Sequence, residues 1–299
     1  MKRLSFVVVP VVIGLGGASA LGQRGFSDVQ IKTTHVAGNI YMLEGRGGNI
    51  GVSVGPDGVL IVDDQFAPLA DKIRAAIGKL GKGKLKFVLN THWHADHTDG
   101  NPEFGPEAVI IAHTNVRQRL AVDQELFRRT IKALPKEGLP VITFDESLTI
   151  HFNGEKIRVV HYPHGHTDGD SMVFFTGSNV VHAGDDFFSG MFPFVDVDHG
   201  GDVDGLTGHI KALIDQLSPD VKIIPGHGPL STLADLKDYH HMLTETTEIV
   251  RKRMAAGKTL DQVKADGLPE EWERWGTGFL STERWLEIVY QSLSKKGTG

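Results

Sequence analysis

Short apolar runs separated by turn residues fill the first half of the chain and predict β-strands. These runs lie at residues 40–43, 50–54, 59–62, 85–89 and 109–112. The run at 85–89 is apolar at nearly every position, which is typical of a strand buried on both faces. Apolar residues at helical spacing predict helices at 67–80 and from about 115 to 131.

The second half repeats this order of strands, helix and strand. Its predicted strands lie at 148–152, 156–161, 172–175, 180–182 and 221–224, with a helix at 205–217. Asn153-Gly154 is a strong signal for a tight hairpin turn between the first two of these strands. The repeated order predicts an α/β protein in which two sheets pack face to face with helices outside.

The two ends of the chain differ from this body. Lys2 and Arg3 precede an apolar stretch at 4–15, and Ala18-Ser19-Ala20 follows as a small-residue cleavage pattern. Glycines make the apolar stretch short for a membrane span. We therefore expect a signal peptide at 1–22, export to the periplasm or the medium, and no stable membrane anchor after cleavage. Residues 231–299 have mainly helical spacing and are expected to extend a domain formed by residues 23–230.

Composition narrows the classes of function. The 299 residues are 40% hydrophobic and 23% charged, as in ordinary globular proteins. The formal net charge is -6 and no run of lysine or arginine marks a nucleic-acid surface, so nucleic acid is not an expected partner. The chain has no cysteine, which excludes disulfides, cysteine acylation and thiolate ligands for a metal.

The densest chemical feature follows the predicted strand at 85–89. His92, His94, Asp96 and His97 place four potential metal ligands within six residues. Residues two apart in an extended segment point to the same side, so His92 and His94 can hold one ion while Asp96 and His97 turn toward another. Without a metal, these imidazoles would crowd one another and serve no packing purpose. The spacing favours two metals over one.

Three further candidate ligands lie in glycine-containing loops after predicted strands of the second half. They are His166, Asp185 and His227. Imidazole and carboxylate ligands suit zinc, manganese or iron. Three histidines near these loops are candidates for supporting the ligands from behind: His161, His164 and His182. The other histidines are interpreted as ordinary surface or core residues: His35, His113, His151, His199, His209, His240 and His241.

These motifs resemble those of the metallo-β-lactamase superfamily. The segment from His92 to His97 matches its His-x-His-x-Asp-His motif, and the later Gly-His-Thr, Gly-Asp and Gly-His-Gly loops follow in the family's order. The resemblance covers about residues 35–230. It implies a four-layer αββα sandwich, with a C-terminal helical segment added, and a centre of two zinc ions, with manganese or iron as alternatives.

The resemblance also assigns the ligands. Those expected for the first metal are His92, His94 and His166, and those for the second are Asp96, His97 and His227. Asp185 is expected to bridge the two ions. Asp186 is the weaker choice for the bridge, because the family motif has its aspartate directly after the glycine.

A dinuclear centre of this family implies a hydrolase. A hydroxide between the metals would attack a carbonyl carbon, and Asp96 would help to orient it. The absence of cysteine excludes the cysteine-ligated β-lactamases, and the bridging aspartate makes the site more like those of glyoxalase II and lactonases. The expected substrate is therefore a small molecule with a β-lactam, lactone, ester or thioester bond.

Two other functions stay open at this point. A mononuclear iron persulfide dioxygenase of the same fold would leave Asp96 and His227 without a metal. A metal-binding protein without catalysis would keep the ligands and lack turnover.

Two aromatic groups also have two interpretations each. Phenylalanines at 187–194 either wall a substrate pocket or fill the core, and three tryptophans either cap the site or cover the body: Trp272, Trp275 and Trp285.

Overall fold

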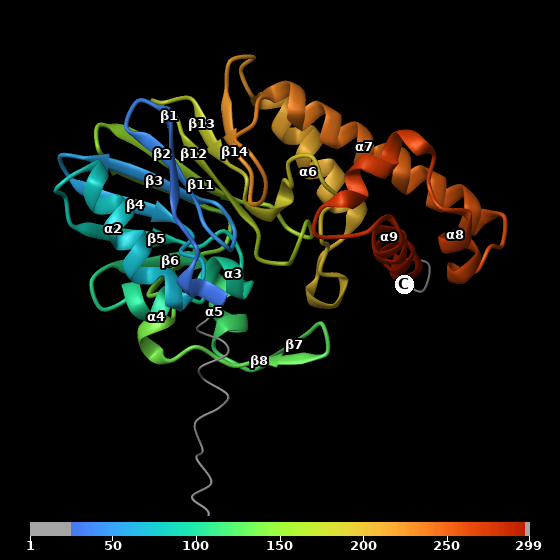
Figure 1. Ribbon diagram of the computed structural model, residues 1–299, viewed down its shortest axis with the longest axis horizontal. Coiled ribbons are helices and arrows are strands. Elements are labelled where there is room, and N and C mark those ends of the chain that lie inside the picture. The colour runs from blue at the N-terminus through green and yellow to red at the C-terminus, as the bar shows by residue number, and fades with distance from the viewer. Residues whose placement is uncertain (1–24, 297–299) are drawn as a thin grey trace, which may run out of the picture.

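The first of two large sheets holds the N-terminal half of the protein. The computed structural model describes residues 25–296, so the expected signal peptide at 1–22 lies outside the described residues (Figure 1). The sheet has the order β1-β2-β3-β4-β5-β6-β9. Its strands are β1 (Lys32–Ala37), β2 (Ile40–Glu44), β3 (Ile50–Gly55), β4 (Gly58–Val62), β5 (Leu85–Leu89), β6 (Val109–His113) and β9 (Ile142–Phe144). Neighbours are antiparallel from β1 to β4 and parallel from β4 onward.

The second sheet holds the other half, in the order β10-β11-β12-β13-β14. Its strands are β10 (Ser147–Phe152), β11 (Glu155–His161), β12 (Ser171–Phe175), β13 (Val180–His182) and β14 (Lys222–Ile224). Asn153 and Gly154 form the predicted turn between β10 and β11, with positive φ at both residues. Only the last pair, β13 with β14, is parallel among the strands of this sheet.

Three apolar clusters hold the layers together. Between the sheets, Leu89 of β5 lies in the same buried cluster as Phe175 of β12. On the outer face of the first sheet, β-strand residues pack with Ile73 of α2 (Ala70–Leu80), whose buried positions recur at helical spacing. On the outer face of the second sheet, Phe174 packs with Leu206 of α6 (Val203–Gln216). The predicted αββα sandwich is therefore confirmed (Figure 1).

Helices α7 (Leu233–Ala255), α8 (Leu260–Asp266) and α9 (Thr282–Lys296) follow the second sheet. Capping boxes at Thr232 and Thr259 fix where α7 and α8 begin. Trp272, Trp275 and Trp285 are buried in the same cluster as α6 and α7. The tryptophans therefore cover the body of the protein. Within residues 25–296, no helix combines the length and the apolar character that crossing a bilayer requires.

The predicted helix from about 115 to 131 is wrong beyond its first turns. Helix α5 (Thr114–Leu120) ends early, and β7 (Gln124–Leu126) and β8 (Arg129–Ile131) then form a hairpin. Its turn residues, Phe127 and Arg128, have φ values of 52 and 60 degrees, which an α-helix does not allow. The helical expectation failed because Phe127 packs against Phe194 of a distant loop, a contact that local spacing does not reveal. The two short remaining helices of this half are α3 (Ala95–Thr98) and α4 (Asn101–Phe104).

Candidate metal centre

The expected ligands meet at one end of the sandwich, although they come from separate loops. Parallel strands carry the loops after them to the same edge of a sheet. This places the loop after β5 at the end of the first sheet, and the loops after β13 and β14 at the facing end of the second. One group of potential ligands consists of His92, His94, His166 and Asp185, and a second consists of Asp96, His97 and His227. In each group, one ligand atom per residue lies within 4.8 Å of the others.

The ring nitrogens of the first group face one another at short range. His94 Nδ1 lies 3.1 Å from His92 Nε2 and 2.8 Å from His166 Nε2. In the second group, His227 Nε2 lies 3.3 Å from His97 Nε2 and 3.2 Å from Asp96 Oδ2. All of these side chains except those of Asp96 and His227 are buried.

Asp185 lies between the two groups. Its Oδ1 is 3.1 Å from His97 Nε2, and its Oδ2 is 3.4 Å from His227 Nε2 and 3.5 Å from His166 Nε2. Oδ1 is buried and has no hydrogen-bond partner within the described residues. A buried carboxylate oxygen without a partner is costly, and a cation between the groups would satisfy it. This position is the one expected of a bridging ligand.

Two buried carboxylates hold histidines of the cluster from outside. His97 Nδ1 donates to Asp63 Oδ2 at 2.7 Å, and His94 Nε2 donates to Asp196 Oδ2 at 2.9 Å. Because each ring donates one proton outward, its other nitrogen faces the cluster and can present a lone pair to a metal. His166 is held in the same way, since its Nδ1 donates to the carbonyl oxygen of Phe194 at 2.6 Å.

Thr91 sets the tautomer of His92. Thr91 Oγ1 donates its single hydrogen to Asp63 Oδ2 at 2.8 Å, so it accepts from His92 Nδ1 at 3.0 Å. His92 Nε2 therefore also faces inward as a lone pair. Nitrogen lone pairs at such distances repel one another unless a proton or a metal lies between them. The donor set and its orientation thus fit two divalent cations.

The carboxylates shift the protonation of the second group. Burial alone would lower the pKa of His227, but Asp185 and Asp96 raise it to about 9. Burial alone would raise the pKa of Asp96, but His97 and His227 lower it to about 2. In the first group, burial lowers the pKa of His92 well below its ordinary value. A metal is therefore expected to displace protons mainly from the second group.

The histidines outside the ligand set have different roles. His182 bridges the carbonyl oxygen of Asn49, at 2.9 Å, and the amide of Gly184, at 3.2 Å, so it positions the loop that carries Asp185. His161 stacks on His113, with ring centroids 3.7 Å apart. The exposed His164 lies 3.2 Å from the carbonyl oxygen of Gly200. Of the three candidates for support, His182 thus holds the loop of Asp185, and His161 Nδ1 contacts the carbonyl oxygen of Asp170, at 2.8 Å, in the loop of His166.

Asp186 points away from the cluster, as its lower rank as a bridge predicts. Its Oδ1 accepts from the amide of His166 at 3.2 Å, and its Oδ2 lies 3.3 Å from His209 Nδ1. Asp186 therefore positions the loop of one expected ligand. The interpretation of His209 as an ordinary residue needs correction to this extent, because burial would lower its pKa but Asp186 raises it.

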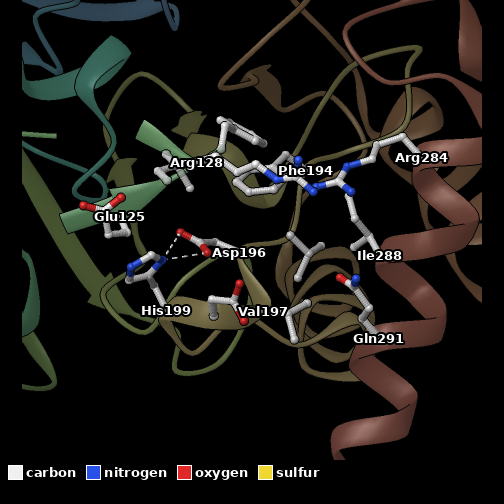
Figure 2. A pocket seen from close by; sticks show the side chains of 13 residues that line it. Glu125, Arg128, Phe194, Asp196, Val197, His199, Arg284, Ile288 and Gln291 are labelled. Atoms are coloured by element: carbon white, nitrogen blue, oxygen red, sulfur yellow. Dashed lines mark hydrogen bonds and ion pairs between the residues drawn. The ribbon is translucent and has the colours of Figure 1, made fainter. Parts of the chain in front are cut away.

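Asp63 and Asp196 are residues near the site that the sequence did not predict, and His199 was wrongly interpreted as an ordinary surface or core residue. Asp63 had a signal, because it directly follows β4, the parallel neighbour of β5, and so ends at the same edge as the histidine loop. Asp196 and His199 had no such signal. His199 Nδ1 lies 2.8 Å from Asp196 (Figure 2), and Asp196 reaches His94 only through the tertiary fold.

Asp196→Asn is expected to weaken metal binding about 10- to 100-fold, because His94 loses the charged acceptor that orients it. Competition with a chromogenic chelator measures the affinity, and circular dichroism checks the fold. Asp198→Asn is the matched control, because Asp198 is two residues away and its side chain is 87% exposed. Equal affinity in Asp196→Asn and the wild type would show that Asp196 does not position His94.

A cavity of about 900 Å³ opens in front of the cluster. His94, Asp96, Asp185 and His227 lie on its wall. Both interpretations of the phenylalanine segment at 187–194 are correct in part. Phe188, Met191 and Phe194 line the cavity, whereas Phe187 and Phe192 are fully buried in the core.

A smaller cavity of about 170 Å³ lies behind the β7–β8 hairpin (Figure 2). Arg128, Asp196 and Arg284 line it, together with Ile288 of α9. Leu126, Phe127 and Phe194 line both cavities and so form the wall between them. The hairpin that replaced the predicted helix is therefore part of the site.

Two known proteins have sequences similar to this chain. The chain is 24% identical over 287 residues to the lactamase-like protein nscB of Trichophyton rubrum, a match that covers 92% of this chain and 79% of that protein. It is 28% identical over 165 residues to the hydroxyacylglutathione hydrolase GloC of Haemophilus influenzae, which covers 51% of this chain and 73% of the relative.

Solved structures share the fold at low identity. The sec-alkylsulfatase Pisa1 from Pseudomonas sp. superposes with a TM-score of 0.65 at 15% identity, and the match covers 87% of this chain and 50% of the sulfatase. The DIM-1 metallo-beta-lactamase superposes with a TM-score of 0.59 at 20% identity, covering 73% of this chain and 99% of that protein. The family model of the metallo-beta-lactamase superfamily matches residues 34–255. With this match and the ligand geometry together, the chain belongs to the metallo-beta-lactamase superfamily.

Proposed function

We propose that the protein is a dinuclear zinc hydrolase that cleaves a carbonyl-centred bond of a small molecule: a β-lactam, lactone, ester or thioester. The observation that carries the proposal is the position of Asp185 between two complete ligand groups on the wall of a large cavity. The name of the Haemophilus relative, a hydroxyacylglutathione hydrolase, supports a thioester or ester among these bonds.

The two ligand groups, joined by Asp185, would hold two divalent cations, which would supply a water of lowered pKa and a Lewis acid for the substrate carbonyl. The chain's own residues supply position and shape. The side chain of Asp96 is 31% exposed and lines the cavity, so it is placed to orient the attacking water. Phe188 and Phe194 line the same cavity and exclude bulk water from the ligands beside them.

The second ligand group argues against a mononuclear iron dioxygenase. Such an enzyme would leave Asp96 and His227 without a function, yet their side chains converge on His97 at short distances. Those contacts raise the pKa of His227 and lower that of Asp96. Such opposite shifts are expected when an imidazole and a carboxylate of one metal site face each other without the metal. The dinuclear hydrolase therefore accounts for more of the site.

A panel of one β-lactam, one lactone, one ester and one thioester tests the proposal on zinc-loaded protein. We expect turnover of at least one class, loss of turnover after chelation, and recovery when zinc is returned. Manganese and iron are loaded in parallel, and the metal that restores the highest kcat/KM identifies the preferred ion. Stable metal binding with no turnover in all four classes would instead support a metal-binding protein without this activity.

We also propose that the protein is exported and that residues 1–22 are removed. The positive start, the apolar stretch and the small-residue pattern at 18–20 support this. N-terminal sequencing of the protein from a periplasmic fraction is expected to begin near residue 23. An intact Met1 on protein that stays inside the cell would contradict export.

A further inference from the structure

The wall of the large cavity has an unusual distribution of charge. Apart from the expected metal ligands, the charged residues that line it within the described part of the chain are Arg46 and Arg129. The rest of the wall is mainly apolar, and its large side chains are Phe66, Leu126, Phe127, Ile131, Phe188, Met191, Phe194 and Phe279. Two cations thus stand on an apolar wall close to the metal centre.

Neither guanidinium is neutralised by a carboxylate of the described residues. Arg46 Nη1 donates to the carbonyl oxygen of Gly25 at 2.5 Å, and its guanidinium carbon lies 5.0 Å from the ring centroid of Phe26. These contacts hold the group in place and leave its charge uncompensated. Arg129 is exposed on β8. Between residues 25 and 296, neither arginine forms an ion pair with a carboxylate, although many other surface arginines and lysines do.

The hairpin separates its two arginines. Arg129 lines the large cavity, whereas its neighbour Arg128 lines the small cavity beside Asp196 (Figure 2). Phe127 lines both cavities, with its ring centroid 4.8 Å from that of Phe194 and 6.4 Å from that of Phe279. Phe127 remains 49% exposed and Phe279 64% exposed, so both present apolar surface at the mouth of the cavity.

We propose that the substrate is an anionic amphiphile, an acyl compound with an apolar body and an acidic group separate from the bond that is cleaved. Arg46 and Arg129 bind the acidic group, and the phenylalanines bind the body. This inference rests on the proposed function, because it concerns the same cavity. A guanidinium on an apolar wall attracts an anion more strongly than one in open water, and a neutral ligand leaves it without a partner.

Two fluorescent probes that differ by one acidic group test the proposal without turnover. They are 8-anilino-1-naphthalenesulfonate and its neutral counterpart N-phenyl-1-naphthylamine, each titrated into zinc-loaded protein. Arg46→Gln and Arg129→Gln are each expected to raise the Kd of the anionic probe about five- to tenfold, because each variant loses one charge-assisted contact. Binding of the neutral probe is expected to stay within about twofold.

Arg128→Gln is the matched control, because it removes the same charge from the same hairpin on the side of the small cavity. It is expected to leave both probes unchanged. Phe279→Ala is expected to weaken the binding of both probes, because Phe279 lines the large cavity and not the small one; this verifies that the probes occupy the large cavity. Three outcomes would overturn the proposal. The arginine variants could lose affinity for both probes equally, both variants could keep the wild-type affinity for the anionic probe, or Arg128→Gln could lose as much affinity for the anionic probe as they do.

Hydrolysis separates this proposal from that of the function. If the protein turns over acyl substrates but prefers neutral esters to their carboxylate-bearing counterparts, the hydrolase stands and the anionic substrate class is wrong. If the anionic probe binds through both arginines but none of the substrates is cleaved, the binding site stands and the hydrolase proposal fails.

Discussion

Asp185→Asn is expected to reduce the metal content of the protein from two ions per chain to about one, and kcat/KM by about 10²- to 10³-fold. Asparagine keeps the shape of the side chain but replaces one of two oxygens with an NH₂ group that has no lone pair for a metal. Both oxygens of Asp185 lie near ring nitrogens of the cluster, at 3.1 Å for Oδ1 and 3.4 Å for Oδ2. Elemental analysis and steady-state kinetics on the same sample measure the two effects.

Asp186→Asn is the matched control for this change. Asp186 is the adjacent residue, is equally buried, and contacts the amide of His166 and the ring of His209 outside the ligand groups. It is expected to keep both metals at saturating zinc, with weaker binding in the first group because Asp186 positions the loop of His166. Two metals in Asp185→Asn with one in Asp186→Asn would move the bridge to Asp186.

His94→Ala is expected to lose most of the metal of the first group and to lower kcat/KM by at least about 10³-fold. His94 Nδ1 is the central atom of this group, since it lies within 3.1 Å of both His92 Nε2 and His166 Nε2. The remaining ligands are two imidazoles and a carboxylate that also serves the second ion, and they surround the gap left by the central nitrogen, so the ion is held more weakly. Metal titration followed by calorimetry measures the affinity that remains.

His151→Ala is a suitable control for His94→Ala, because His151 is an exposed residue of β10. It is expected to retain the metal content and the activity of the wild type. The melting temperatures of the metal-free proteins show whether either variant is misfolded. Wild-type activity in correctly folded His94→Ala would contradict the assignment of the first ligand group.

The elements that local pattern predicts well are those with continuous or periodic apolar residues. The run at 85–89 was recognisable as the strand β5 because apolar side chains pack on both of its faces. Asn153-Gly154 identified its hairpin because few other residue pairs adopt two positive φ values easily. The ligand motifs were recognisable because His92, His94, Asp96 and His97 are close in sequence and therefore close in space.

What local pattern did not predict depends on contacts between distant residues. Phe127 and Arg128 have no sequence signal for a tight turn, and their hairpin is stabilised by packing on Phe194. Asp196 reaches His94 from 102 positions away along the chain. The cavity that joins Arg46 to Arg129 likewise exists only after the two sheets have packed. The residues predicted to bind metal, and His182 behind them, were therefore accessible from sequence, whereas Asp196 and the two arginines of the cavity were not.

Titration of metal-free protein with zinc, with turnover measured after each addition, is the most direct test of the dinuclear hydrolase. We predict that hydrolysis of the best substrate from the panel rises until two equivalents of zinc are bound and then stays constant. Activity that is complete at one equivalent, or a protein that binds one iron and hydrolyses none of the substrates, would contradict the account.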